Sequence, residues 1–317
     1  MANKLIVSAA PHITSADSTS KIMGRVCIAL LPTLIASVLI FGFQALLLTA
    51  VTVAACVVFE YAYCKLVGRD VTISDLSAVV TGLLLAFNLP AGLPVWMSLV
   101  GAFIAIVIIK QLFGGLGYNF ANPAIVGRIA MALGFTGAMT SYTYPENGID
   151  ALASATPLAV EETAQNAGSY VTLLLGNHGG VLGETCASTL LIGGIYLIWT
   201  KVISPTIPVT YLATVAVFSL LCGYDPIYQL LSGGLILGAF FMATDYVTSP
   251  TTEKGKLVFG IGLGVITCLI RFFGTMNEGV SFAILLMNLV VPYIEVNTRQ
   301  DKLGIAKAKK SKEGAAK

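Results

Sequence analysis

The segment at residues 148–162, GIDALASATPLAVEE, places an acidic side chain and hydroxyl groups at a spacing that could serve a cofactor. Asp150 precedes Thr156 by six residues (156 minus 150), and Ser154 and Ala155 come just before the threonine. A Thr-Pro pair before apolar and acidic residues is typical of a helix start, with Thr156 as the N-cap. The functional alternative is a phosphate ester on the Thr156 hydroxyl, because the free N–H groups of a helix N-terminus stabilise an anion.

Other catalytic patterns are weak. The chain has only two histidines, His12 and His178, no phosphate-binding Walker loop, and no arrangement of Ser, His and Asp typical of a hydrolase. Hydrolase and ATPase functions are therefore not favoured. The six cysteines lie mostly in apolar stretches and form no CxxC pair, which is typical of small buried side chains rather than metal ligands or disulfides.

Four charged residues in or beside apolar stretches could act on ions. Arg128 lies in NPAIVGRIAMAL, and an unpaired charge at the bilayer centre costs at least about 2.5 kcal/mol. It could hold a phosphate or an acidic partner, or it could extend to the cytoplasmic edge. Asp245, Glu60 and Asp75 are candidates along an ion route, because carboxylate oxygens suit hard cations. Each could equally be a solvated group at a helix end.

Composition places these residues in a membrane protein. Of the 317 residues, 56% are hydrophobic and 11% are charged, against roughly 25% charged in soluble domains. The sequence predicts an all-α membrane protein of about ten transmembrane helices. Apolar runs between turn residues put them at 26–43, 44–66, 76–89, 94–110, 121–139, 185–201, 207–223, 226–243, 256–273 and 278–295. The polar first twenty residues predict that no signal peptide is removed.

Lysines and arginines set the expected direction of the helices. Most of them fall at the same ends of the predicted spans, from Lys4 and Arg25 to the basic segment at 296–317. Because short loops rich in Lys and Arg stay in the cytoplasm, we expect both termini there and the acidic loop at 140–184 outside. Arg271 is the one exception. The basic tail suits a solvated end or contact with acidic membrane lipid or a partner; no other feature suggests nucleic-acid binding.

The chain looks duplicated. Lys110 in IAIVIIKQLFGG corresponds to Arg271 in GVITCLIRFFGT, a displacement of 161 residues (271 minus 110) that also carries the first span onto the sixth. Five spans in each copy make the two copies inverted in the membrane. The third and eighth spans are short, rich in Gly, and end in the breaker sequences NLPAGLP and TDYVTSP. Such paired broken helices indicate a central site or pathway, although Gly can also simply allow close helix packing.

Across nearly its whole length, the sequence resembles the family of membrane subunits that includes RnfD of the Rnf complex and NqrB of the sodium-pumping NADH:quinone reductase. The resemblance rests on VSAAPHI, TGLLLAFNLP, GGLGYNFANPA, SATPLA and FMATDYVTSP. The length is closer to RnfD, because NqrB-type chains carry an N-terminal extension. The resemblance implies a subunit in the bacterial cytoplasmic (inner) membrane that couples ferredoxin oxidation and NAD reduction to Na+ or H+ translocation.

The resemblance also implies a covalent flavin. A flavin transferase attaches FMN through its phosphate to a threonine that follows an aspartate by six residues and ends a run of small residues. Asp150, Ala155 and Thr156 match this signal, whereas Ala153 and Ser154 replace the usual Ser or Thr and Gly. Ser154 is thus a second possible target. Arg128 could then hold a flavin phosphate. The family further suggests a non-covalent flavin, riboflavin, in a pocket that no residue of the sequence identifies.

The resulting organisation has five parts: a cytoplasmic segment at 1–25, a five-helix repeat at 26–139, a flavin-attachment loop at 140–184, a second five-helix repeat at 185–295, and the basic tail at 296–317. The partners implied by the resemblance are RnfA, RnfB, RnfC, RnfE and RnfG, with the flavin transferase during maturation. Two alternatives stay open: a secondary transporter or channel, which shares inverted repeats, and a passive scaffold without flavin.

Overall fold

The computed structural model describes residues 17–142, 168–176, 178–184, 186–274 and 279–299. These residues are helical, apart from turns and one isolated β-bridge between Pro90 and Val181. This confirms the all-helical prediction for the described part of the chain. Asp150, Ser154, Ala155 and Thr156 lie outside the described residues.

The first group of helices follows the predicted spans, although α1 (Thr19–Phe41) begins seven residues before the predicted start (26 minus 19). The group consists of α1, α2 (Phe43–Val67), the 3-10 turn η1 (Ile73–Asp75), α3 (Ser77–Phe87), α4 (Val95–Phe103) with its π-helical continuation η2 (Ile104–Gln111), α5 (Pro123–Gly134) and α6 (Thr136–Met139). The predicted span at 121–139 is therefore two helices, because the backbone leaves the helical conformation at Phe135.

The second group begins after α7 (Gly168–Leu175), a helix that the sequence did not predict within the loop at 140–184. It consists of α8 (Ala187–Trp199), α9 (Thr206–Cys222), α10 (Pro226–Leu231), α11 (Leu235–Leu237) with the π-helical η5 (Gly238–Met242), α12 (Glu253–Phe273) and α13 (Val280–Thr298). The predicted span at 226–243 is interrupted at Ser232, Gly233 and Gly234, where Gly233 has a positive φ of 66°.

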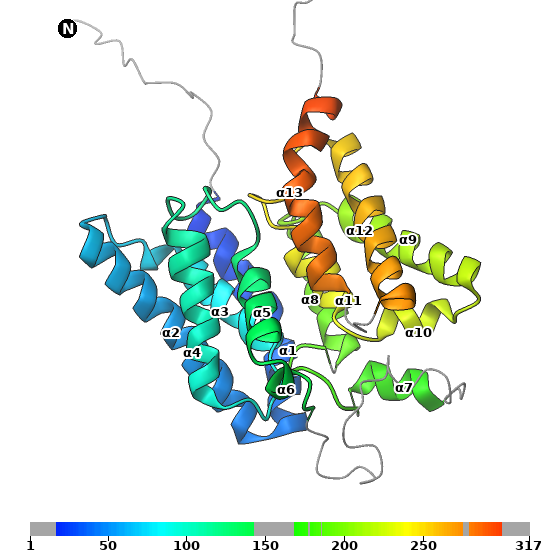
Figure 1. The fold of residues 1–317 in the computed structure, drawn as a ribbon, viewed down its shortest axis with the longest axis horizontal. Helices are drawn as coiled ribbons and strands as arrows, with labels where there is room; N and C mark the ends of the chain where they lie inside the picture. Colours follow the sequence, from blue (N-terminus) through cyan, green and yellow to red (C-terminus); the bar gives the residue numbers. More distant parts are fainter. Residues whose placement is uncertain (1–16, 143–167, 177, 185, 275–278, 300–317) are drawn as a thin grey trace, which may run out of the picture.

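Four helices in the described residues, α1, α2, α12 and α13, are long and apolar enough to cross a membrane, and further helices are apolar but shorter. The chain is therefore a multi-helix membrane protein. In Figure 1, α2 to α5 lie on one side and α9 to α13 on the other, and α1 packs against α8 between the two groups. The beginning of α1 and the end of α13 lie at one end of the molecule, whereas α6 and α7 lie at the opposite end.

Small residues let α1 and α8 approach closely. A Cβ atom added at Gly193 of α8 would stand 2.2 Å from the carbonyl oxygen of Ala29 in α1, and one added at Gly194 would overlap the ring of Phe240. Glycine at these two positions is therefore required by the close approach of neighbouring atoms, as at other close helix crossings in membranes.

The two broken helices of the chain are too short to cross a membrane alone. The 11 residues of α3 rise about 16 Å at 1.5 Å per residue, roughly half of the ~30 Å hydrocarbon layer. Beyond its end, the backbone N–H of Gly183 donates to Phe87 O (2.8 Å), and that of Leu182 to Leu89 O (3.1 Å). The predicted outer loop thus returns into the protein and satisfies backbone groups that lipid could not.

The short helix of the second group runs in the opposite direction to α3. The end of α3 pairs with Gly183, and the beginning of α11 lies against Glu184, the next residue in the chain. At the far ends, Ser77 at the start of α3 and Asp245 just after η5 line the same cavity. The amides of Asn122 and Asn288 support the chain after η5: Asn122 Nδ2 donates to Met242 O (3.3 Å), and Asn288 bonds the carbonyl oxygen of Thr248.

Candidate functional site

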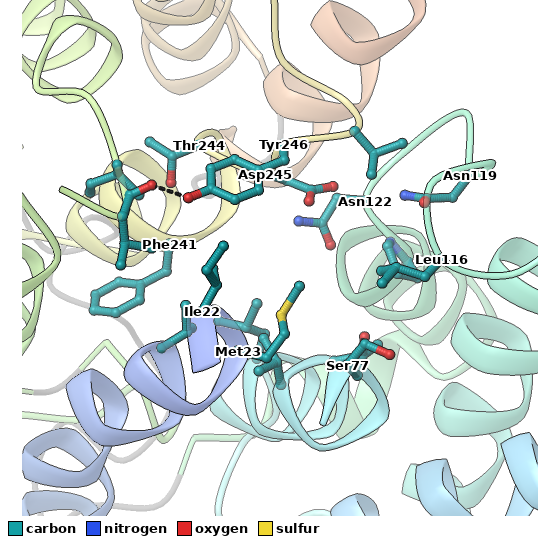
Figure 2. Close-up of a pocket in the computed structure, with 18 of the residues that line it drawn as sticks. Ile22, Met23, Ser77, Leu116, Asn119, Asn122, Phe241, Thr244, Asp245 and Tyr246 are labelled. Atoms are coloured by element: carbon teal, nitrogen blue, oxygen red, sulfur yellow. Dashed lines mark hydrogen bonds between the residues drawn. The ribbon is translucent and has the colours of Figure 1, made fainter. Parts of the chain in front are cut away.

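A cavity lies between the two groups of helices, near the end of the molecule that carries the start of α1 (Figure 2). Its empty volume is about 790 Å³, part of which opens to the outside. Its walls come from α1, α3, η2, α5, α8 and η5. Apolar side chains cover most of the wall, with Leu84 and Leu197 on facing groups of helices and Phe241 from η5.

Polar groups gather on two sides of this cavity. In Figure 2, Asn119, Asn122 and Asp245 stand together on one side, and Ser77 lies across the cavity from them. The Asp245 carboxylate accepts a hydrogen bond from Thr248 Oγ1 (3.0 Å). Asp245 is half-buried. A carboxylate of the second group of helices thus lies at a cavity whose other wall belongs to the first group.

A buried ion pair stands behind the Ser77 side of the cavity. Lys110 Nζ lies 2.7 Å from Glu60 Oε2 and 2.6 Å from Ser77 Oγ. Glu60 is 0% exposed and Lys110 3% exposed. Lys110 and Ser77 both line the cavity. The Glu60–Lys110 pair therefore connects a buried residue of α2 with the cavity wall.

Hydrogen bonds extend this pair into a five-residue chain, which we call the Glu60 cluster: Thr72, Glu60, Lys110, Ser77 and Asp75. Thr72 Oγ1 donates to Glu60 Oε1 (2.7 Å), and Ser77 Oγ donates to Asp75 Oδ1 (2.5 Å). Thr72 is exposed. The cluster therefore runs from the outside of the protein to the cavity, and it contains two carboxylates and one ammonium group.

The three carboxylates predicted for an ion route are thus brought near one another. Glu60 and Asp75 belong to the Glu60 cluster, and Asp245 lies at the cavity that this cluster borders. Sequence reasoning used Lys110 to align the two copies of the chain and missed it as a site residue. The available signal was a charged side chain inside the apolar run IAIVIIKQLF, because ionisable groups inside membranes are seldom without a function.

Arg128 lies in a second polar cluster, away from the cavity. It is 7% exposed, its guanidinium bonds Ser281 Oγ, and it stands 3.9 Å from Glu184 Oε1. Its acidic partner is thus a residue of the same chain, and the side chain does not extend to the cytoplasmic edge.

Arg271, the exception in the charge distribution, caps the end of α10. Its guanidinium donates to Gln229 O (2.8 Å) and to Ser232 O (3.1 Å). A cation at the last carbonyls of a helix compensates groups that have no partner within that helix. This contact explains why an arginine stands in the last turn of α12, at the end of the helix that lies away from the start of α1 and the end of α13.

Comparison with known proteins identifies the family to which this chain is similar. Residues 6–304 match the NQR2, RnfD, RnfE family. The chain is 47% identical over 310 residues to the D component of the Na(+)-translocating ferredoxin:NAD(+) oxidoreductase complex of Acetobacterium woodii, covering 96% of this chain and 97% of the relative. It is 41% identical to the D component of the proton-translocating ferredoxin:NAD(+) oxidoreductase complex of Clostridium ljungdahlii, covering 95% and 97%.

A third relative, the D component of the ion-translocating oxidoreductase complex of Actinobacillus succinogenes, is 36% identical, with 92% of this chain and 96% of the relative covered. The similarity therefore runs through both groups of helices and both polar clusters rather than through one motif. On this whole-chain similarity, the protein belongs to the NQR2, RnfD, RnfE family.

Proposed function

We propose that this chain is the D-type membrane component of a complex that couples electron transfer from ferredoxin to NAD with the translocation of Na+ or H+. The observation that carries the proposal is 47% identity, over 96% of the chain, to a component of a Na(+)-translocating ferredoxin:NAD(+) oxidoreductase complex. Its partners are then the other subunits, RnfA, RnfB, RnfC, RnfE and RnfG, in the bacterial cytoplasmic membrane. Deleting the chain is expected to abolish ferredoxin-dependent NAD reduction and the accompanying ion uptake in membrane vesicles.

Two inverted repeats are part of the proposal. α3 and η5 run in opposite directions, and the cations at corresponding positions make corresponding contacts. Lys110 bonds Ser77 at the start of α3, and Arg271 bonds Ser232 just before α11. Ten membrane crossings with both termini in the cytoplasm fit the positions of the helix ends in Figure 1.

The covalent cofactor of this proposal is FMN, joined through its phosphate to Thr156 on the extracytoplasmic side. The support is the sequence signal of Asp150, Ala155 and Thr156 together with membership of the family. A bound flavin supplies the electron transfer, and the covalent bond fixes its reach to a redox partner.

Fluorescence in a denaturing gel tests the attachment. The full-length chain, made together with the flavin transferase, is expected to give a fluorescent band under ultraviolet light, and Thr156→Ala is expected to remove it while the protein still inserts. Ser154→Ala is the matched control and should stay fluorescent. A band that fluoresces in Thr156→Ala but not in Ser154→Ala would move the attachment to Ser154. A secondary transporter, a channel or a passive scaffold would give no fluorescent band in any variant.

The cavity is the place we propose for the second, non-covalent flavin. Its apolar walls suit a flat aromatic ring system, and the amides of Asn119 and Asn122 stand at its polar side, where they could bond the ring's nitrogens and carbonyls (Figure 2). Met23→Trp, which fills the cavity from α1, is expected to lower the flavin that acid releases from the purified complex. Ile28→Trp on the exposed face of the same helix is the control.

Asp245, Glu60 and Asp75 are proposed to lie along the route of the ion. The support is that Asp245 lines a cavity between the two groups of helices and that Glu60 and Asp75 are hydrogen-bonded to Lys110 and Ser77 in its wall. Transport proteins with inverted repeats place their sites between the repeats. Asp245→Asn is expected to reduce the Na+ or H+ dependence of turnover. Unchanged ion dependence in this variant would remove Asp245 from the route.

A further inference from the structure

The ammonium group of Lys110 occupies a place that a free cation could fill. Its two neighbours are oxygen atoms, Glu60 Oε2 at 2.7 Å and Ser77 Oγ at 2.6 Å. The Ser77 hydroxyl donates its hydrogen bond to Asp75 Oδ1, so its oxygen offers a lone pair to the ammonium group of Lys110. Carboxylate and hydroxyl oxygens are also the ligands that hard cations prefer.

The charges of the Glu60 cluster leave room for a further cation. Its hydrogen bonds join the carboxylates of Glu60 and Asp75 to one ammonium group. Glu60 lies fully within the protein, and a buried carboxylate that loses its counter-ion is strongly unfavourable. If the ammonium moves away, another cation or a proton must therefore compensate Glu60.

The Lys110 side chain is placed so that it can move. It lies in the π-helical segment η2, and π-helical turns are frequent at functional sites. It lines the cavity, whereas Glu60 lies behind it in α2. A flexible lysine between a buried carboxylate and a cavity can exchange one environment for the other.

The pair has no counterpart at the matching positions of the second group of helices. The position 161 residues after Glu60 (221 minus 60) is Leu221, which is 81% exposed, and Arg271 at the position of Lys110 bonds backbone carbonyls and an amide. At these matching positions, only the first group of helices thus carries a carboxylate paired with the cation.

We propose that Lys110 is a tethered cation that competes with the transported ion for the oxygens of Glu60 and Ser77. When the ammonium stays, the site is closed; when it turns toward the cavity, Na+ or H+ takes its place on Glu60. This inference rests on the proposed function for the identity of the ion. It assigns to Lys110 the control over when the ion binds to Glu60.

Binding to the full-length chain tests this without any electron transfer. We would follow the thermal midpoint of the detergent-solubilised, fluorescently tagged chain in NaCl and in choline chloride of equal concentration. Lys110→Met removes the ammonium, so Na+ is expected to stabilise this variant more than the wild type. The Na+ concentration that gives half of the shift in thermal midpoint should be at least about fivefold lower for Lys110→Met than for the wild type. A factor of about five is the lower end of the usual coupling between two sites. Lys110→Arg keeps a cation and should behave as the wild type.

Two further variants separate a cation site from loss of a structural salt bridge. Lys110→Met with Glu60→Gln removes the carboxylate as well and should lose the additional Na+ response. Lys65→Met, at an exposed lysine near the end of α2, should never gain it. If the ion is H+, Lys110→Met responds to lower pH instead of Na+, because a protonated Glu60 needs no counter-ion.

The proposal is overturned if Lys110→Met responds to neither Na+ nor lower pH, or if Lys110→Arg gains the same response. Should Lys110→Met fail to accumulate at low Na+, growth of the cells in high Na+ or at lower pH is expected to restore it; no restoration, while the double variant accumulates, would equally overturn the proposal. Because these measurements need no ferredoxin, NAD or flavin, their failure is distinct from a failure of the proposed function.

Discussion

Arg128 and Glu184 show how one ion pair can join segments that are distant in the sequence. Arg128 is in α5, Glu184 precedes α8, and Ser281, the other partner of Arg128, begins α13. Both charged side chains are almost fully buried. The two charges compensate each other, and the pair ties the end of the 140–184 loop to the first group of helices.

Removing one member of this pair should destabilise the protein. Arg128→Gln leaves Glu184 buried without its nearest cation, and such a loss typically costs roughly 3–5 kcal/mol. We expect a lower thermal midpoint and less protein in the membrane. Arg128→Gln with Glu184→Gln should recover most of the loss, because no uncompensated charge remains. A double variant no more stable than Arg128→Gln would contradict this role of the pair.

The residue scale is also where the sequence was least informative. Of the predicted candidates, Asp245 lines the cavity, whereas Glu60 and Asp75 reach it only through Lys110 and Ser77. Lys110 and Glu60 are 50 residues apart in the chain. No periodicity or local spacing relates positions so distant, so the pairing depends on how α2, α3 and η2 pack. Thr156 and Asp150 stay predictions, because they lie outside the described residues.

At the scale of helices, hydropathy and turn residues predicted most of the positions. The span predicted at 44–66 is α2, Phe43–Val67, and that at 207–223 is α9, Thr206–Cys222. The structure differs from the prediction at two places. Ser232 and two glycines break the helix expected at 226–243, and α7 lies in the segment at 140–184, which was predicted as a loop from its acidic residues.

The crossing of α1 and α8 gives a prediction at this scale. Gly193→Ala would place its Cβ 2.2 Å from Ala29 O, and a backbone atom cannot move aside without separating the helices. We expect strongly reduced accumulation and a lower thermal midpoint. Gly24→Ala in α1 is the control, because its Cβ would meet the nearest atom at an ordinary 3.9 Å. Similar behaviour of the two variants would show that close contact at Gly193 is unimportant.

At the scale of the whole molecule, the helix ends separate two faces. The start of α1 and the end of α13 share one end of Figure 1, and α6 and α7 share the other. Together with the distribution of Lys and Arg, this arrangement favours cytoplasmic termini. With the proposed orientation, the cavity would lie near the cytoplasmic end and the Arg128–Glu184 pair farther out.

Cysteine labelling in intact cells tests this orientation. In a variant without the six native cysteines, Thr140→Cys after α6 is expected to react with an impermeant maleimide from outside, whereas Asn297→Cys at the end of α13 should be protected until the membrane is opened. Both side chains are exposed in the structure, so access to the protein surface does not bias the comparison. The reverse pattern would invert the proposed topology.

The cavity between the helix groups also changes where the membrane voltage acts. Water that enters the cavity while no flavin fills it would carry the potential of that side into the protein, so that the voltage would drop mainly between the cavity and the Arg128–Glu184 end. Moving one elementary charge through the full potential is worth about 2.3 kcal/mol per 100 mV. A cation that reaches Glu60 through the cavity would therefore work against little of this field, and nearly all of the electrical work would fall on the step from the cavity to the outside.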